Sequence, residues 1–285
     1  MRQTIEDAYT PEELRKLQLL ELSIYKDFVR ICKKYDIAYY AFYGTLLGAV
    51  RHKGIIPWDD DIDVFVLPEG YEKLQQVLPQ ELGERYEFIN AENNPQYPFL
   101  TSRIMLRGTE FRTWSMRKLK CESGIFLDIF CAHYVLEEKK LRDKQFRYCW
   151  IYEKMFILHH FSEPNLPYKG LKRVAVFAMC AVGHLVLKLF PRKFLLNKAN
   201  KWAYMYDRQK TGLLANVFSL SAKKTIFPYT DIFPLKEVPF EDTTMMIPAN
   251  ANKILAHYFG EDYMTPLPEG KRSYVIPYKL DFGEY

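Results

Sequence analysis

Four aspartates follow Pro57-Trp58 at positions 59, 60, 61 and 63. Like charges about 4 Å apart repel by roughly 1 kcal/mol in water and about 4 kcal/mol near a protein surface, so this crowding is destabilising unless a cation joins the carboxylates. If the stretch is a strand, alternation places Asp61 and Asp63 together on one face. Such a pair suits Mg²⁺, with Mn²⁺ as an alternative, since both ions take carboxylate oxygens and keep water or phosphate as further ligands. The competing interpretation is a solvated acidic turn.

A phosphate site is predicted just upstream, where Gly44 and Thr45 separate an apolar run from a helical one. With Thr45 as the cap of that helix, backbone N–H groups at its start can face an anion. Gly48 would let the helix approach the sheet closely. Arg51, one or two turns further on, can bring a guanidinium to a phosphate, with Lys53 as a weaker candidate. A plain tight turn and a surface charge are the alternatives.

A further carboxylate, Asp128, interrupts an apolar run of Ile, Phe and Leu from 125 to 130. A carboxylate is costly to bury in such a strand unless it has a partner or a function. We therefore expect Asp128 to accept a proton from a substrate hydroxyl or to ligate the metal. A satisfied structural acid is the third interpretation.

The elements that must position these residues follow from hydrophobic periodicity. Helices are expected at 11–35, 45–50, 68–82 and 137–161, and strands at 37–43, 61–67, 85–90, 99–106 and 125–130. Strands early in the chain and helices later indicate an α+β fold with an additional mainly helical region. We expect a catalytic core over 1–135, a helical, basic and apolar region over 136–225, and a C-terminal segment over 226–285 that completes the site.

One segment has an unusual charge pattern. From Pro164 to Tyr206 there is no Asp or Glu, whereas Lys or Arg occupies positions 169, 172, 173, 188, 192, 193, 198 and 201. Within it, Val174 to Leu187 is nearly all apolar, but shorter than the roughly 20 residues that cross a bilayer. Two interpretations stay open: a buried core helix with solvated basic ends, or a helix in the membrane interface, with 171–201 as a peripheral membrane contact.

Composition bounds the class of protein. The 285 residues are 48% hydrophobic and 26% charged, as in a folded soluble protein, and a net charge of +5 without a long basic tail argues against nucleic acid as a partner. The five cysteines show no metal-ligand spacing and predict buried thiols in a reducing compartment. The chain opens on polar residues without a signal-peptide pattern, so we expect it in the cytoplasm, at the inner face of the plasma membrane if the apolar segment binds lipid.

Two stretches together resemble a known family: Gly44-Thr-Leu-Leu-Gly-Ala-Val-Arg and Pro57-Trp-Asp-Asp-Asp-Ile-Asp. They look like the signature of the LicD family, which includes bacterial phosphocholine transferases and is similar to the catalytic part of fukutin and fukutin-related protein. Weaker similarities follow: Gly124-Ile-Phe-Leu-Asp-Ile-Phe resembles the second acidic strand of the family, and Tyr258-Phe-Gly-Glu-Asp-Tyr-Met-Thr-Pro resembles its C-terminal block.

The resemblance implies a nucleotidyltransferase fold, with a mixed-sheet core like the palm of DNA polymerase beta. It also implies a role for each residue that matches the motifs. Phosphate binding falls to Gly44 and Thr45, and metal binding to Asp61, Asp63 and the third carboxylate, Asp128. The cytidine diphosphate pocket would be lined by Arg51, Trp58 and Asp59.

The activity implied is that of an enzyme: Mg²⁺-dependent transfer of a phosphoalcohol, phosphocholine first, from a CDP-alcohol to a sugar hydroxyl, with release of CMP. The acceptor would be a cell-surface glycan or a lipid-linked precursor, such as lipopolysaccharide or teichoic acid. Aromatic rings would bind the choline, with Trp114, Tyr263 and Tyr274 among the candidates. Three alternatives stay open: the same site with CDP-ribitol, CDP-glycerol or CDP-ethanolamine, a nucleotidylyltransferase acting on a nucleoside triphosphate, and a non-catalytic glycolipid-binding protein.

Overall fold

The first element is a long helix, α1 (Pro11–Lys34), in a computed structural model that describes residues 8–162, 170–272 and 275–285. A capping box fixes its start, because the Thr10 hydroxyl accepts from the Glu13 N–H and the Glu13 carboxylate accepts from the Thr10 N–H. The predicted apolar stripe is buried. Two polar residues, Gln18 and Glu21, lie buried on the same stripe. The helix therefore presents polar groups to the interior as well as apolar ones.

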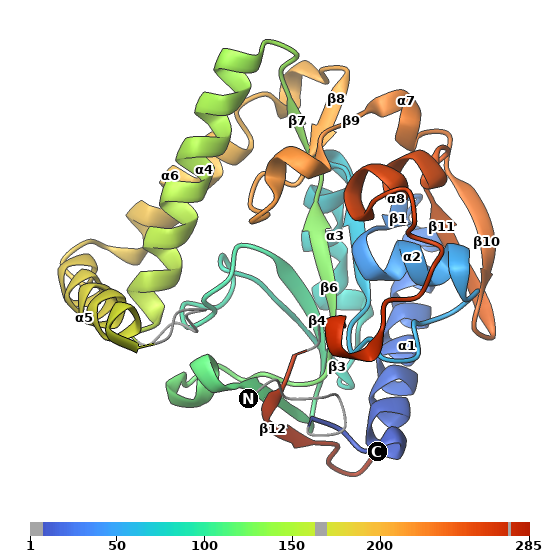
Figure 1. Cartoon of the computed structure of the whole chain (residues 1–285), viewed down its shortest axis with the longest axis horizontal. Helices are drawn as coiled ribbons and strands as arrows, with labels where there is room; N and C mark the ends of the chain where they lie inside the picture. Colours follow the sequence, from blue (N-terminus) through green and yellow to red (C-terminus); the bar gives the residue numbers. More distant parts are fainter. Residues whose placement is uncertain (1–7, 163–169, 273–274) are drawn as a thin grey trace.

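A five-stranded mixed sheet forms the centre of the molecule, with strand order β1-β2-β6-β4-β3 (Figure 1). Its strands are β1 (Tyr39–Ala41), β2 (Asp63–Val66), β3 (Tyr86–Ile89), β4 (Ser102–Leu106) and β6 (Phe126–Cys131). The pair β2–β6 is parallel, and the other three pairs are antiparallel. All five strands were predicted from the sequence, and α1 packs against β4 and β6. The predicted α+β class is confirmed.

Two helices follow the first two strands. The short α2 (Tyr43–Arg51) lies between β1 and the loop that leads to β2, and α3 (Pro68–Glu81) follows β2. The prediction that Thr45 caps α2 is wrong, because the helix starts at Tyr43 and Phe42 is its N-cap. Gly48 does permit a close approach, but to the loop and not to the sheet: an added Cβ would lie 2.5 Å from the Gly54 carbonyl oxygen.

Three helices form an arm beside the sheet (Figure 1). They are α4 (Lys139–His160), α5 (Gly170–Leu187) and α6 (Arg192–Ala203). The α4 helix packs against both others, and α5 lies at the outer end of the arm. The prediction of a mainly helical region is confirmed in the arm.

The remaining elements surround the sheet. A three-stranded sheet has the order β7-β8-β9, formed by β7 (His133–Val135), β8 (Leu213–Ala215) and β9 (Phe227–Pro228). The hairpin of β10 (Lys236–Phe240) and β11 (Thr243–Ile247) is flanked by α7 (Tyr229–Ile232) and α8 (Ala251–Phe259). A further pair joins β5 (Glu110–Thr113) to β12 (Pro277–Asp281). The chain therefore returns to strands after the arm, which the sequence did not predict, and the three proposed domain boundaries stay predictions.

Short 3-10 helices complete the chain: η2 (Trp114–Lys118), η3 (Asp207–Gln209), η4 (Ala222–Thr225) and η5 (Glu269–Lys271). The largest core lies between α1, α2, α3 and the central sheet, and smaller apolar clusters stabilise the arm. The arm is tied to the sheet by Arg192, which donates to the carbonyl oxygens of Ala91 and Asn94 in the loop after β3.

The close approach at Gly48 gives a stability prediction. Gly48→Ala should lower the free energy of unfolding by about 1–3 kcal/mol, because the new methyl group meets backbone atoms that cannot move away alone. Urea denaturation followed by circular dichroism measures the change. Gly212→Ala is the matched control, since its Cβ would make only an ordinary contact with Glu137 Oε1 at 3.4 Å, and should stay within about 0.5 kcal/mol. Equal effects of the two substitutions would contradict the prediction.

Candidate active site

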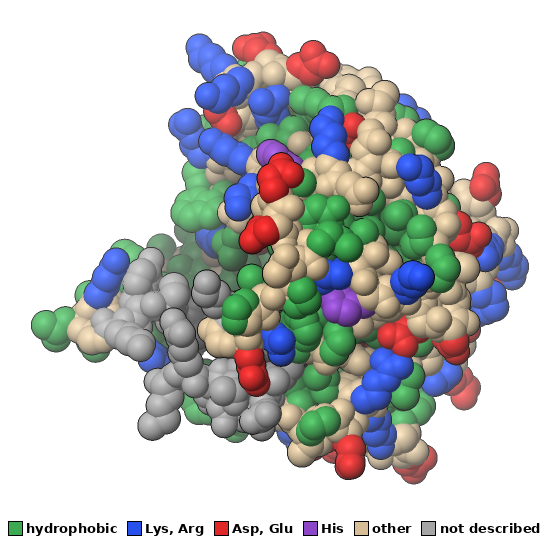
Figure 2. All heavy atoms as spheres, turned by 45° about the vertical axis from the view of Figure 1, so that its right-hand side comes forward, with side chains coloured by type: hydrophobic (Ala, Val, Ile, Leu, Met, Phe, Trp, Pro, Cys, Tyr) green, Lys and Arg blue, Asp and Glu red, His purple; other side chains and the backbone are tan. Residues whose placement is uncertain are grey.

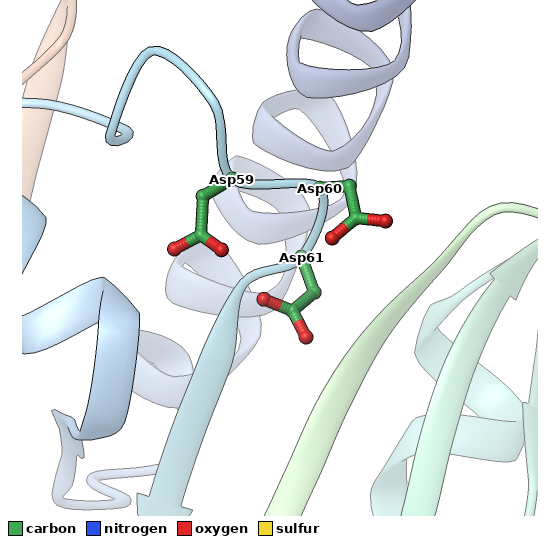
Figure 3. Close-up of side chains that lie close together, drawn as sticks. All are labelled: Asp59, Asp60 and Asp61. Atoms are coloured by element: carbon green, nitrogen blue, oxygen red, sulfur yellow. The ribbon is translucent and has the colours of Figure 1, made fainter. Parts of the chain in front are cut away.

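The acidic loop before β2 brings three carboxylates together. One ligand oxygen from each of Asp59, Asp60 and Asp61 lies within 4.8 Å of the others, the one such group among the described residues. Figure 3 shows the side chains spreading from the loop in different directions, with Asp61 nearest the start of β2. Asp61 lies before the strand, so strand alternation does not place it beside Asp63 as predicted. The loop itself positions it.

Asp63 and Asp128 meet across the central sheet. They are register partners in the parallel pair β2–β6, so their Cα atoms lie side by side, and both residues are 7% exposed. Neighbouring strands therefore carry these two acids, as the resemblance implied, but among the described residues neither belongs to the group of carboxylates within 4.8 Å of one another, and their role as metal ligands stays a prediction. The N–H of Asp63 donates to the Thr45 hydroxyl (2.8 Å), which ties α2 to the first residue of β2.

Asp60 also holds the C-terminal segment. Its Oδ2 accepts from the Tyr9 hydroxyl (2.7 Å) and from the Val275 N–H (3.3 Å). Tyr9 also donates to the carbonyl oxygen of Val275. These bonds give Asp60 a structural role, and they bring the chain start and the C-terminal segment to the acidic loop.

Arg103, on β4, is the residue that sequence reasoning missed beside Asp128. Its Nε donates to Asp128 Oδ1 (2.7 Å) and its Nη2 donates to Oδ2 (3.2 Å), in a bidentate ion pair whose side chains are 15% and 10% exposed. The guanidinium also lies 3.6 Å from the centre of the Phe126 ring. Burial lowers the pKa of Arg103, but the Asp128 carboxylate outweighs burial and the net shift is upward. The alternating position of Arg103 within an apolar strand was the available sequence signal.

Glu21 is a second residue that sequence reasoning missed. It lies on α1, is 1% exposed, and its Oε2 has no hydrogen-bond partner. Burial, and then the negative charges of Asp61, Asp60 and Asp59, raise its pKa well above the ordinary value. Glu21 falls on the apolar stripe of α1, where a charged residue is out of pattern, and this was its sequence signal.

The first turn of α2 lies against the acidic loop. A Cβ at Gly44 would collide with the carboxylate of Asp59, so only glycine leaves room for that side chain. Burial, followed by the charge of Asp60, raises the pKa of Asp59 to about 7. The N–H groups of Gly44 and Thr45 belong to the first helical turn, where intrahelical acceptors are lacking. They are suited to an anion.

The predicted pocket residues Arg51 and Trp58 lie together at the far side of the loop. The Arg51 guanidinium is 5.9 Å from the centre of the Trp58 ring, and its Nη1 donates to the Tyr263 carbonyl oxygen (2.8 Å). Arg272 lies 3.8 Å from the same ring and was not predicted. The C-terminal segment therefore reaches both residues.

The three aromatic residues predicted to bind choline have different outcomes in the structure. Trp114 packs edge-on against Tyr278, on the β5–β12 side of the molecule. Tyr274 lies outside the described residues. Tyr263 stays a candidate, because its backbone contacts Arg51.

Burial and mutual repulsion both disfavour the charged forms of these carboxylates, and a bound cation would offset that cost. Burial comes first and neighbouring carboxylates second in raising the pKa of Asp61 and of Asp63 well above the ordinary value. For Asp63 the nearest opposing charge is Arg103. Glu21 adds a buried oxygen without a hydrogen-bond partner, and the charges of these acids raise its pKa as well. A hard divalent cation with oxygen ligands fits this donor set.

Comparison with known proteins gives a family match over part of the chain. Residues 36–159, which include Gly44, the acidic loop and Asp128, match the model of the LicD/FKTN/FKRP nucleotidyltransferase domain. This segment of the chain is similar to the LicD family. It is 40% identical over 129 residues to the lipopolysaccharide cholinephosphotransferase LicD of Haemophilus influenzae (strain ATCC 51907 / DSM 11121 / KW20 / Rd), a match that covers 45% of this chain and 47% of that protein.

Two rickettsial proteins are also similar to this chain. An uncharacterized protein of Rickettsia prowazekii (strain Madrid E) is 47% identical over 77 residues, which are 25% of this chain and 29% of that protein. One of Rickettsia typhi (strain ATCC VR-144 / Wilmington) is 44% identical over 88 residues, which are 29% of this chain and 28% of that protein. The chain spans less than half of the length of these curated relatives. The LicD-family match is therefore a statement about the domain.

The ion pair at the centre of the site gives a second stability prediction. Arg103→Met should lower the free energy of unfolding by about 3–5 kcal/mol, because it leaves the buried Asp128 carboxylate without its partner. Arg107→Met is the control: Arg107 is 53% exposed, its ion pair with Glu87 is long at 3.9 Å, and its loss should cost at most about 1 kcal/mol. Chemical denaturation measures both. A small effect of Arg103→Met would show that Asp128 does not depend on this arginine.

Proposed function

We propose that this protein transfers a phosphoalcohol, phosphocholine first, from a CDP-alcohol to a sugar hydroxyl of a cell-surface glycan or lipid-linked precursor. The observation that carries the proposal is the set of buried carboxylates beside the start of α2, inside the segment that is similar to the LicD family. The relative in Haemophilus influenzae is named a lipopolysaccharide cholinephosphotransferase. Lipopolysaccharide is accordingly the first acceptor to test.

In the proposed reaction the acceptor oxygen attacks the phosphorus that bears choline. A new phosphorus–oxygen bond forms, the bond from that phosphorus to the bridging oxygen of the diphosphate breaks, and CMP leaves. Catalysis of such transfers depends mainly on positioning and on neutralising charge at the phosphoryl oxygens. Asp61, Asp63 and Asp128 would hold Mg²⁺, or Mn²⁺, which when bound supplies positive charge to the diphosphate.

The other proposed roles follow from position. The N–H groups of Gly44 and Thr45 would bind phosphate, and the positive end of the α2 dipole adds to this. Arg51, Trp58 and Asp59 would line the nucleotide pocket. Both oxygens of Asp128 already accept from Arg103, but each carboxylate oxygen has a second lone pair. The ion pair with Arg103 supports the interpretation of Asp128 as a satisfied structural acid, and the remaining lone pairs allow the proposed role as proton acceptor or metal ligand.

We also propose that the core is a nucleotidyltransferase fold like the polymerase beta palm. The support is the family description and a mixed sheet in which β2 and β6 bring acidic residues side by side, next to a short helix that follows a strand. A true nucleotidylyltransferase would use the same fold and attack a nucleoside triphosphate. Release of pyrophosphate from such a substrate distinguishes it from the transferase, which releases CMP.

The proposed activity is tested by removing its carboxylates one at a time. Asp61→Asn and Asp63→Asn should each lower kcat/KM for CDP-choline by at least about a hundredfold, and EDTA should abolish activity. CMP release is followed by chromatography, and ³¹P NMR of the glycan product identifies the group transferred. Asp242→Asn, which removes an exposed carboxylate, is the control and should retain full activity.

Parallel reactions with CDP-ethanolamine, CDP-glycerol and CDP-ribitol assign the phosphoalcohol. Turnover of one of these without turnover of CDP-choline would reject phosphocholine. If no donor is consumed and the Asp61→Asn variant supports glycan decoration in cells as well as the native protein, the enzyme proposal fails and a glycolipid-binding role takes its place.

The α5 helix is proposed to bring the protein to the membrane. The helix begins at Gly170, four residues before the apolar stretch predicted from Val174, so the prediction of a stretch too short for a bilayer is corrected. Its 18 residues, with mean hydropathy 1.6, are long and apolar enough to cross one, and only 6% of them are buried. Leu171 and Leu185 are 89% and 69% exposed, and Leu187 is its one buried residue. The interpretation of this stretch as a buried core helix is therefore wrong. One side of α5 is held by α4, where His184 Nδ1 contacts the Leu158 carbonyl oxygen (2.7 Å).

The charge around α5 favours an anionic lipid surface. Between residues 170 and 206 the chain has no acidic residue, and α5, α6 and the turn between them carry seven Lys or Arg residues: Lys172, Arg173, Lys188, Arg192, Lys193, Lys198 and Lys201. In Figure 2 hydrophobic and basic side chains gather on the part that projects at the left, where α5 lies. A peripheral contact through 171–201, at the inner face of the plasma membrane, would place the site near a lipid-linked acceptor.

Vesicle binding tests this contact. The full chain should sediment with vesicles of phosphatidylglycerol and phosphatidylcholine, and Leu185→Glu should weaken binding by about tenfold or more, because a Leu side chain contributes roughly 1.5–3 kcal/mol when buried. Leu220→Glu is the control, since Leu220 is 83% exposed but lies outside the arm helices. Equal binding by both variants, or a dimer that α5 holds together in solution, would contradict the contact.

A further inference from the structure

The buried carboxylate of Glu21 has no explanation within the fold. Glu21 lies on the apolar stripe of α1 between Leu17 and Ile24, is 1% exposed, and has no hydrogen-bond partner on Oε2. An uncompensated buried acid costs several kcal/mol, so natural proteins rarely keep one without a function. An apolar residue at this position would pack with its neighbours on α1 without that cost.

The groups that surround Glu21 belong to the acidic site. The charges that influence it most, after burial, are those of Asp61, Asp60, Asp59 and Asp128. One turn earlier on the same face, Gln18 donates to the carbonyl oxygens of Ile56 (3.2 Å) and Asp59 (2.9 Å). The face of α1 that carries Gln18 and Glu21 is therefore in contact with the acidic loop, and Glu21 adds negative charge to a place that already has an excess.

We infer that Glu21 is a positioning residue of the cation site, and that its carboxylate accepts hydrogen bonds from water bound to the cation. The inference rests on the proposed metal site and extends it to a residue outside the LicD-matched segment, which begins at residue 36. Gln18, one turn before Glu21 on the same face of α1, contacts the backbone of the acidic loop, so a water molecule can join the Glu21 carboxylate to a cation held there. Mg²⁺ usually keeps several waters, and such outer carboxylates orient them.

The inference gives the acidic residues two different roles at the cation. The loop and strand carboxylates would contact the cation directly, while Glu21, fixed on a rigid helix, would hold the water on the side facing the core. Since outer partners of this kind typically change metal affinity by about 10–100-fold, Glu21 should be measurable by binding alone.

The test is Mg²⁺ and Mn²⁺ binding to the full chain by calorimetry, without any substrate. Glu21→Gln keeps the shape and removes the charge, and it should weaken binding by about tenfold or more. Glu12→Gln, an exposed residue on the same helix with the same charge change, is the control and should bind like the native chain. In metal-free buffer Glu21→Gln should melt at or above the native Tm, and added Mg²⁺ should raise its Tm less.

The outcomes separate the inference from the proposed function. If the native chain binds Mg²⁺ and Glu21→Gln binds it equally well, with an equal rise in Tm, Glu21 is not part of the site and the inference is overturned. If the native chain binds neither cation, the metal part of the proposed function fails and the inference falls with it. If circular dichroism shows that Glu21→Gln does not fold, Glu21→Asp is used in its place. It keeps the charge but shortens the side chain, so the carboxylate no longer reaches the bound water. A Mg²⁺ affinity close to that of the native chain would then overturn the inference.

Discussion

Repulsion between buried carboxylates is the constraint around which the rest of the site is built. Asp63 and Asp128 cannot move apart, because they are paired in register on parallel strands in the middle of the sheet. Asp61 is fixed by the loop that enters β2, and Glu21 by a helix packed on the sheet. The repulsion is therefore relieved by protonation or by added positive charge, and the chain itself supplies Arg103 beside Asp128.

The acidic loop has no regular secondary structure, yet side chains from distant parts of the chain hold its backbone. Gln18 of α1 binds two of its carbonyl oxygens. Glu241, in the β10–β11 turn, accepts from the Ile55 N–H (3.0 Å) and pairs with Arg15. Asp60 joins it to Tyr9 and Val275. These hydrogen bonds together hold the loop in place against the repulsion between its carboxylates.

The arm follows a different physical logic from the core. Its helices are stabilised by small apolar clusters, one of which includes Phe156, Leu187 and Leu195, and most of α5 is left in contact with solvent. Exposed apolar area of this extent is unfavourable in water unless another surface covers it. The core therefore contains the cluster of acidic residues, whereas the arm carries the exposed apolar and basic surface.

The sequence by itself determined much of the local structure and the main site residues. Periodicity predicted α1, α3 and α4 and the five central strands, because each has a clear apolar pattern of its own. The crowding of Asp59 to Asp63 and the isolated acid at Asp128 predicted an acidic site, since such residues are out of place beside apolar strands. The order of the strands was not in these patterns, because pairing depends on contacts between residues far apart in the chain.

Tertiary structure alone decided which side chains compensate or add to the charge. Arg103 pairs with Asp128 because β4 lies beside β6, and Glu21 reaches the acidic loop because α1 packs across the same strands. It also decided that α5 is exposed: an apolar helix in a core and one on a surface have the same sequence pattern, and only its neighbours distinguish them. The sequence determines which charged and apolar side chains are present, whereas long-range packing determines their charged neighbours and their exposure to solvent.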